Sequence, residues 1–373
     1  MNNNTQKQSP LIKLDWIKER NPKLTIISLL LLGIFLYIAD NRFDAYQVRV
    51  LNLCAIYTVL GLSMNLINGF TGLFSLGHAG FMAIGAYTCA LLTMPVAVKD
   101  QNFFLEPINE VLRTMVLPYP AALLVGGIFA ALMAFLIGAP VLRLKGDYLG
   151  IATLGFAEII RIVITNLQTI TNGALGLKSI PAKTNLWWSY GIAVFTTVFL
   201  VWLINSSYGR AFKAIREDEI AAEAMGINLF KHKVLSFVIG AFFAGVGGGL
   251  LGNLLGAINP LLFRFTLTFN ILLIIVLGGM GSITGTIISA FIVTIGQEAL
   301  RFLDQPFSLG FIQVPGISGL RMVVFSALLM LVVLFFRRGL MGTNEFSWDS
   351  FIGFFKNLGK GPGKPLSKGG TES

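Results

Sequence analysis

Long apolar stretches recur along the whole of this chain, and no other feature constrains its fold as strongly. A helix needs about 20 apolar residues to cross the hydrocarbon core of a bilayer. Ten stretches have a suitable length and composition: 24–39, 48–68, 75–96, 119–138, 147–166, 187–205, 232–257, 265–280, 283–303 and 319–337. The sequence therefore predicts an all-α polytopic membrane protein with about ten transmembrane helices, within a range of eight to ten.

The composition supports a lipid-facing exterior. Of the 373 residues, 55% are hydrophobic and 12% are charged, whereas a soluble domain carries about 25% charged residues. The two cysteines lie in apolar stretches and are interpreted as small buried hydrophobes. The only histidines, His78 and His232, have no Cys or acidic cluster near them in the sequence. We therefore expect no metal site and no cofactor.

The distribution of positive charge predicts the orientation of the spans. With ten spans and a cytoplasmic N-terminus, 18 Lys and Arg residues fall on the inner side and nine on the outer side, and Arg161 is left within the membrane. This excess agrees with the positive-inside rule, so we expect both termini in the cytoplasm. The net charge of +10 therefore indicates membrane topology and no nucleic-acid partner.

Three regions follow from this topology. The polar, basic segment 1–23 is expected to be a cytoplasmic N-terminus leading into a retained first helix, because no cleavage signal follows the first apolar stretch. The transmembrane domain covers 24–337. Within it, the Gly-rich break between 265–280 and 283–303 leaves two alternatives open, namely two spans or a re-entrant or broken helix. The cytoplasmic tail, 338–373, is expected to form a helix on the inner interface and then a disordered end.

The longest polar interruption between spans lies at 208–233 and reads YGRAFKAIREDEIAAEAMGINLFKHK. Its residues are good helix formers and Gly226 is placed to end a helix, so we predict one amphipathic helix over 209–228. A helix that lies on lipid usually carries a Lys/Arg-rich face and large apolar residues. This segment has four acids and small alanines instead, which suits packing into a groove of a protein. An ordinary solvated loop helix is the alternative.

Part of this segment resembles a known coupling motif. The string 221–226, AAEAMG, resembles the E-A-A-x-x-x-G coupling loop of permeases in ATP-binding-cassette importers, with Ile220 in the place of the acid expected before the Ala pair. The longer string 209–228, GRAFKAIREDEIAAEAMGIN, resembles the branched-chain amino acid permease family of the LivM type.

Three further segments resemble the same family: 62–87 (LSMNLINGFTGLFSLGHAGFMAIGAY), 146–161 (GDYLGIATLGFAEIIR) and 271–285 (ILLIIVLGGMGSITG). Together the resemblance covers about residues 50–337, which is nearly the whole of the predicted transmembrane domain.

The resemblance implies a multi-pass permease subunit in the cytoplasmic (inner) membrane of a prokaryote, paired with a second, homologous permease. Two cytoplasmic ATPase subunits and an extracytoplasmic substrate-binding protein would complete the importer. The substrate would be an amino acid, with leucine, isoleucine or valine expected. The residues that would contact the ATPases are Arg216, Glu217, Asp218, Glu219, Ala221, Ala222 and Gly226.

No enzyme activity is expected of the chain itself. It has no G-x-x-x-x-G-K-[ST] phosphate loop, and a G-x-G-x-x-G match at Gly247, Gly249 and Gly252 lies inside an apolar stretch with no strand before it. ATP hydrolysis would therefore occur in partner subunits and act on this chain through a cytoplasmic contact, for which 209–228 is the well-formed candidate.

Small and charged residues within the spans give further candidates. Five glycines in 232–257 predict close packing of helices, with lining of a pore as the alternative: Gly245, Gly248, Gly249, Gly252 and Gly256. Glu158 and Arg161 are three residues apart on one helix face and predict a local ion pair. A role of this pair in the pathway or between two permeases is the alternative, because charged groups within a membrane are costly. His78 predicts a hydrogen bond between helices.

Three alternatives to an amino-acid importer remain open. An importer of the same class for urea or a short amide would suit an equally weakly polar interior. A self-sufficient secondary carrier or channel is disfavoured, because a single intramembrane ion pair offers no uncompensated carboxylate for proton or sodium coupling. A membrane scaffold without transport activity is disfavoured because the sequence predicts no other folded domain.

Overall fold

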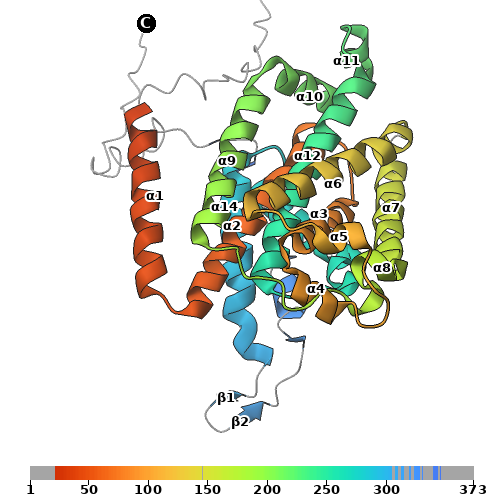
Figure 1. Ribbon diagram of the computed structural model, residues 1–373. Helices are drawn as coiled ribbons and strands as arrows, with labels where there is room; N and C mark the ends of the chain where they lie inside the picture. Colours follow the sequence, from red (N-terminus) through yellow and green to blue (C-terminus); the bar gives the residue numbers. More distant parts are fainter. Residues whose placement is uncertain are drawn as a thin grey trace, which may run out of the picture.

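The computed structural model describes residues 22–144 and 146–304, and beyond them 307–309, 312–314, 319–320, 323–327, 330, 339–342 and 345. Nearly all of this described part is helical (Figure 1). The longer helices are α1 (Pro22–Arg42), α2 (Ala45–Asn65), α3 (His78–Thr93), α6 (Tyr119–Val141), α7 (Asp147–Asn166), α9 (Leu186–Asn205), α10 (Ser207–Glu217), α12 (Leu229–Leu255), α13 (Phe265–Gly278) and α14 (Ile283–Ala299).

Shorter elements connect these helices. They are α4 (Val96–Asn102), α5 (Glu110–Thr114), α8 (Gln168–Thr171) and α11 (Glu219–Ala224), the π-helix η1 (Leu66–Phe70), and the 3-10 helices η2 (Gly173–Leu175), η3 (Pro260–Phe263) and η4 (Leu300–Asp304). Two short strands, β1 (Phe307–Leu309) and β2 (Ile312–Val314), pair in an antiparallel hairpin that the sequence analysis did not predict.

Nine of the ten predicted stretches form helices in the described part of the chain. Six helices there are long and apolar enough to cross a membrane: α1, α2 continued by η1, α6, α7, α9 and α12. Three shorter apolar helices, α3, α13 and α14, account for the next three. The prediction of a mostly helical, multi-pass membrane protein is thus confirmed.

Several finer features of the topology stay predictions. The tenth stretch, 319–337, lies largely outside the described residues, so the total of ten spans and the side on which the termini lie stay predictions. The segment before Pro22 and the tail helix expected after Glu345 also fall outside the described residues. The pair 265–280 and 283–303 is seen as α13, a turn and α14. With 14 residues, α13 is roughly 21 Å long and too short to cross the hydrocarbon core alone.

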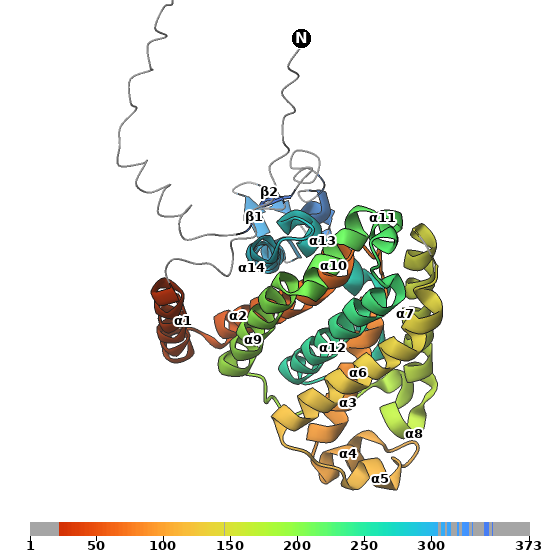
Figure 2. The ribbon, with the colours of Figure 1, turned by 90° about the horizontal axis from the view of Figure 1, so that it is seen from above.

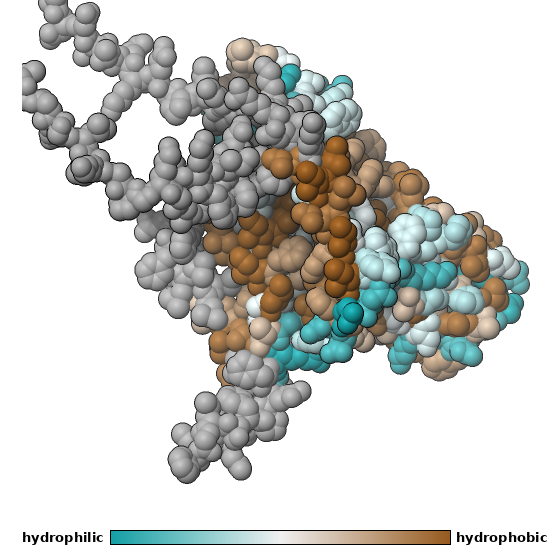
Figure 3. All heavy atoms as spheres, turned by 90° about the vertical axis from the view of Figure 1, so that its left-hand side faces the viewer, coloured by the Kyte–Doolittle hydropathy of each residue, from teal (hydrophilic) through white to brown (hydrophobic). Residues whose placement is uncertain are grey.

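The helix α12 lies at the centre of the bundle, and α2, α3 and α6 pack around it (Figure 2). The pair α13 and α14 packs against α2. The helix α1 stands apart at one edge (Figures 1 and 2), with Leu30 62% and Ile34 57% exposed. From the α1 side, apolar side chains form a broad band, and hydrophilic residues lie below it (Figure 3). Such an apolar exterior is expected of a surface that faces lipid.

Two ends of the molecule matter for function. The helices α10 and α11 lie at one end, which we call the α10–α11 end, and the strands β1 and β2 lie at the other, which we call the hairpin end (Figure 1). The C-terminal end of α2 and the α13–α14 turn contact α10, so they lie at the α10–α11 end. The helix α2 therefore runs from one end to the other, as does α14.

Glycines bring α12 into direct backbone contact with its neighbours. A Cβ atom added at Gly85 of α3 would collide with the backbone of Gly245, and one added at Gly248 would collide with the Met82 carbonyl. A Cβ at Gly249 would lie 2.8 Å from a methyl carbon of Leu123 on α6. Gly252 has ordinary contacts, and Gly256 follows the end of α12 with φ +73°, which glycine adopts without strain.

We expect Gly248→Val to destabilise the bundle. The added side chain cannot fit against Met82 unless α3 and α12 separate, and overpacking of this kind costs about 1–3 kcal/mol or more. The matched control is Gly155→Val on α7, because a Cβ built at Gly155 comes within 4 Å of no described atom beyond its chain neighbours and its own helix backbone. Thermal denaturation of the purified variants in detergent measures the effect; equal midpoints for the two would contradict the role of this contact.

Candidate coupling site

The polar segment at the α10–α11 end forms two helices, so the prediction of a single helix over 209–228 was wrong. Helix α10 ends at Glu217 and α11 begins at Glu219, and Asp218 between them is extended, with φ −160° and ψ 113°. The Asp218 side chain accepts hydrogen bonds from Ile220 N at 2.8 Å and Ala221 N at 3.1 Å. Asp is a strong N-cap residue, and this local capping overrides the helix propensity of its neighbours.

Helix α10 is anchored through its apolar face. Phe212 is completely buried and Ile215 nearly so. Phe212 packs in a cluster with Phe70 of η1, Leu203 of α9 and residues of α2 and α14. The burial of one large aromatic side chain contributes about 1.5–3 kcal/mol. Packing of this apolar face therefore holds α10 against α2, α9 and α14.

Arg216 connects α10 to two irregular backbone segments. Its Nη1 donates a hydrogen bond to the Gly69 carbonyl at 3.0 Å. Its stem lies against Gly72, where an added Cβ would be 2.8 Å from the Arg216 Cγ. Its guanidinium lies against the α13–α14 turn, where a Cβ on Gly281 would be 2.6 Å from Nη1. Both glycines have positive φ, +76° and +89°, so any other residue would be strained as well as crowded.

Asn65, the last residue of α2, bonds to the α13–α14 turn that Arg216 also contacts. Its Nδ2 donates to the Ser282 carbonyl at 2.9 Å and to Thr286 Oγ1 at 2.8 Å, and its Oδ1 accepts from Gly281 N at 2.9 Å. The Asn65 side chain is fully buried. Helix α10, the end of α2 and the α13–α14 turn thus form one hydrogen-bonded unit, which we call the coupling network.

A short stretch of the C-terminal region also reaches this turn. Glu345 accepts hydrogen bonds from Ile283 N at 2.8 Å and Thr284 N at 3.0 Å, so it caps the N-terminus of α14. Leu340 N donates to the Leu277 carbonyl at 2.7 Å. Burial lowers the pKa of Lys213 on α10, and the Glu345 carboxylate opposes that shift. The α13–α14 turn is therefore held from both sides.

Helix α11 presents the exposed part of the segment. Ile220 is 79% and Met225 83% exposed, which is unusual for large apolar side chains on a polar helix. Glu217 is also exposed and pairs with Arg216 at 2.6 Å. Glu219 pairs at 2.6 Å with the largely buried Lys233 at the start of α12. This surface combines apolar side chains with acids.

The predicted coupling residues thus divide by position. Glu217, Ala221 and Gly226 are exposed, and Gly226 has φ +83° at the end of α11. Asp218 and Glu219 are engaged in the cap and the ion pair, and Ala222 is buried. Arg216 points into the bundle. Sequence reasoning missed the exposure of Ile220 and Met225, although large apolar residues in a polar segment were an available signal for it. It also missed the hydrogen bonds of Asn65.

The intramembrane candidates lie away from the coupling network. Arg161 Nε donates to Glu158 Oε1 at 2.9 Å, so these residues form a pair along α7. His78 is buried, with its Nε2 3.0 Å from Ser63 Oγ on α2. The predicted local pair and interhelical hydrogen bond are thus both present, while any role in a pathway stays a prediction. Within the described residues, no group of three His, Cys, Asp or Glu side chains could hold a metal ion.

Comparison with known proteins agrees with this architecture of a multi-pass helical membrane protein. The model of the branched-chain amino acid transport system / permease component family matches residues 46–334. The chain is 34% identical over 317 residues to the high-affinity branched-chain amino acid transport system permease protein LivM of Escherichia coli (strain K12), covering 76% of this chain and 69% of that protein. The chain belongs to this permease family.

Other similar proteins are also branched-chain amino acid permeases by name. The LivM protein of Salmonella typhimurium (strain LT2) is 34% identical over 293 residues, 69% of this chain and 64% of its own length. The chain thus spans about two thirds of the length of these two relatives. The high-affinity permease protein LivH of Escherichia coli (strain K12) is 26% identical over 333 residues, 83% of this chain and 97% of that protein. No solved structure gives a significant match.

We expect Asn65→Ala to destabilise the coupling network. The substitution removes the acceptor of Gly281 N and the hydrogen bonds that Asn65 donates to the Ser282 carbonyl and to Thr286 Oγ1. A buried group left unpaired costs roughly 1–3 kcal/mol. The matched control is Asn205→Ala, whose side chain donates to the Val201 carbonyl of its own helix. Unfolding in a mixed-micelle denaturant titration measures both variants. An Asn65→Ala midpoint equal to that of the control would contradict the network.

Proposed function

We propose that this chain is the permease subunit of an ATP-driven importer that carries branched-chain amino acids inward across the cytoplasmic membrane of a prokaryote. A second, homologous permease, two ATPase subunits and an extracytoplasmic binding protein complete the importer. Membership of the permease family supports the transport role, and the names of the LivM and LivH relatives support the substrate class. The chain supplies no catalytic group, and ATP is hydrolysed in the partner subunits.

The observation that carries this proposal is the coupling network around Arg216. An exposed helical surface at one end of the molecule is connected through the half-buried Arg216 side chain to two irregular backbone segments of the membrane bundle. An ATPase that docks on α11 would act on α10, because the two helices adjoin at Asp218. Arg216 would then transmit the displacement to the end of α2 and the α13–α14 turn.

The charge of the segment supports a cytoplasmic location for the α10–α11 end. Arg210, Lys213 and Arg216 lie on α10, and Lys231 and Lys233 lie at the start of α12. A concentration of Lys and Arg between two spans is typical of the inner side. The ATPases would therefore meet α11 from the cytoplasm, and the hairpin end would face the binding protein.

Two discrete arrangements of the bundle are needed for alternating access. The coupling network would be the element that switches between them, because its parts are closely packed and hydrogen-bonded to one another. Motion of α10 toward or away from the bundle would break the Arg216 contact with Gly69 or carry η1 with it. Either result changes the end of α2, which extends through the bundle to the hairpin end.

We expect Arg216→Met to reduce ATP-driven leucine uptake by about tenfold or more, because the link to Gly69 is lost while the stem still fills the space near Gly72. Association with the ATPases should be retained, because the exposed surface of α11 is unchanged. The matched control is Arg210→Met, an exposed residue of the same helix. Uptake into proteoliposomes that hold the complete importer gives the measurement, and normal uptake by the Arg216 variant would refute the role of this link.

We expect Glu219→Lys to leave the chain inserted in the membrane but to uncouple transport from ATP hydrolysis. The substitution replaces the ion pair with Lys233 by two like charges and reverses the charge of the docking surface. The control is Glu110→Lys, an exposed acid on α5 near the hairpin end. Uptake and ATPase activity are measured together in proteoliposomes. Wild-type uptake in the Glu219 variant would show that α11 is not the coupling surface.

Purification in mild detergent separates the rival functions. Recovery of a second permease and ATPases with the chain supports the importer. Uptake by the chain alone in liposomes would favour a secondary carrier or channel. Capture of urea or a short amide, in place of leucine, by the associated binding protein would change the substrate and keep the importer.

A further inference from the structure

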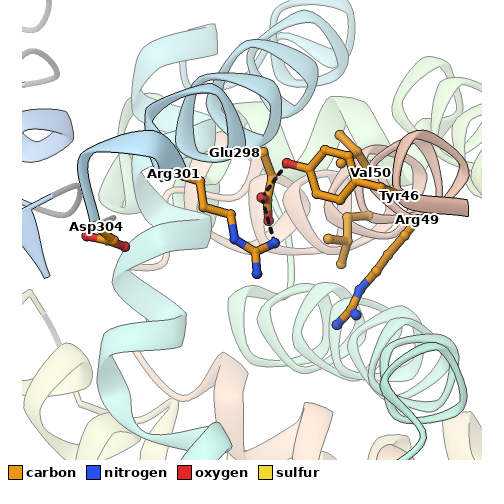
Figure 4. A pocket seen from close by; sticks show the side chains of 7 residues that line it. Tyr46, Arg49, Val50, Glu298, Arg301 and Asp304 are labelled. Carbon is orange, nitrogen blue, oxygen red and sulfur yellow. Dashed lines mark hydrogen bonds and ion pairs between the residues drawn. The ribbon is translucent and has the colours of Figure 1, made fainter. Parts of the chain in front are cut away.

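A pocket lies between the N-terminal part of α2 and the C-terminal end of α14, near the hairpin end (Figure 4). Its volume of about 490 Å³ falls in the usual range of small-molecule sites. Four of its residues follow one face of α2, and three come from the end of α14 and from η4: Tyr46, Arg49, Val50, Leu53, Glu298, Arg301 and Asp304.

One wall of the pocket is a fixed polar network. The Tyr46 hydroxyl donates to Glu298 Oε2 at 3.0 Å, and Arg301 Nη1 lies 3.7 Å from the same oxygen. The Arg301 guanidinium also lies over the Tyr46 ring, 5.9 Å from its centroid. Asp304 accepts a hydrogen bond from Gly319 N at 3.2 Å. The position of the Glu298 carboxylate is thus set by two neighbours before any ligand binds.

Arg49 is different. It extends from α2 on the other side of the pocket from Asp304 (Figure 4). Its side chain is exposed, and among the described residues no carboxylate lies within ion-pair distance of it. An arginine without a partner at the edge of a pocket is suited to bind a carboxylate from a ligand, because its planar guanidinium matches the two carboxylate oxygens.

The balance of charge restricts the ligand. Among the described residues that line the pocket are two guanidinium groups and two carboxylates, and their charges sum to zero. A simple anion would meet Glu298 and Asp304, and a simple cation would meet Arg49 and Arg301. A zwitterion can satisfy both signs at once. Val50 and Leu53 add an apolar surface on α2 against which an aliphatic group can pack.

We propose that this pocket binds a free α-amino acid with an aliphatic side chain, with the carboxylate on Arg49, the ammonium on the Glu298–Asp304 side and the side chain against Val50 and Leu53. The inference rests on the proposed function, because in that orientation the pocket lies at the end where the substrate arrives. It is a loading site of modest affinity, since its charged groups stay accessible to water. The headgroup of phosphatidylethanolamine shares the zwitterionic chemistry, so the test must distinguish the two sources.

The experiment measures binding of L-leucine by the purified full-length chain in nanodiscs of phosphatidylglycerol, which carries no ammonium group. We expect saturable binding that weakens about tenfold or more in Arg49→Gln, because a charge-assisted hydrogen bond is lost. Arg42→Gln is the matched control: Arg42 is an exposed arginine at the end of α1 that does not line the pocket, and its loss should leave leucine affinity unchanged. Isoamylamine, which lacks the carboxylate, and isocaproate, which lacks the ammonium, should compete poorly.

Three results would overturn the inference: equal leucine affinity in the Arg49 and Arg42 variants, competition by isoamylamine or isocaproate as strong as that of leucine, or loss of wild-type binding when phosphatidylethanolamine replaces the lipid. The last would identify a lipid headgroup as the occupant. Uptake by the complete importer tests the proposed function separately. If uptake is ATP-driven but the KM for delivered leucine is unchanged by Arg49→Gln, the pocket proposal fails and the importer stands.

Discussion

The backbone contact between α3 and α12 determines the spacing of the bundle. Gly85 and Gly245 leave no room for a side chain between the two helices, and Gly248 repeats the contact one turn later against Met82. Apolar side chains gain little by leaving lipid for a protein interior, so close van der Waals contact over small residues must hold such helices together. The central position of α12, and with it the placement of α2 and α6, depends on this contact.

A second constraint is that backbone groups outside the helices need hydrogen-bond partners. Between η1 and α3 the chain is irregular, and such backbone is tolerated in a membrane protein only where other groups supply its hydrogen bonds. Asn68 accepts from Ser75 N and donates to the Ser75 carbonyl, and Thr153 Oγ1 accepts from Leu76 N. In the same way, Asn65 bonds to the backbone of the α13–α14 turn, and Arg216 donates to the Gly69 carbonyl of η1. The polar residues that stabilise the irregular segments are thus also those that connect them to α10.

The two proposed sites are joined by the same pair of helices. Helix α2 carries Arg49 at one end and Asn65 at the other, and α14 carries Glu298 at one end and receives Glu345 at the other. The two helices pack along their length. A shift of this pair that follows movement of α10 would therefore alter the pocket at the hairpin end, which is the behaviour that alternating access requires.

The sequence by itself determined that the chain forms long apolar helices, where nine of them lie, and which polar segment separates α9 from α12, because hydrophobic length and composition are local properties. It also suggested the local pair of Glu158 and Arg161, which depends only on helical spacing. It did not determine the break at Asp218, since capping by the Asp218 side chain competes with the helix propensity of its neighbours, and composition alone does not show which of the two prevails. Lys99, counted as an outer positive charge, is fully buried, with its ammonium 2.6 Å from the Leu112 carbonyl. The direction of Arg216, the Asn65 contacts and the placement of Arg49 and Glu298 around one pocket bring together residues from distant parts of the chain. Only the tertiary structure could decide those, because they depend on how α2, α10 and α14 are placed against one another.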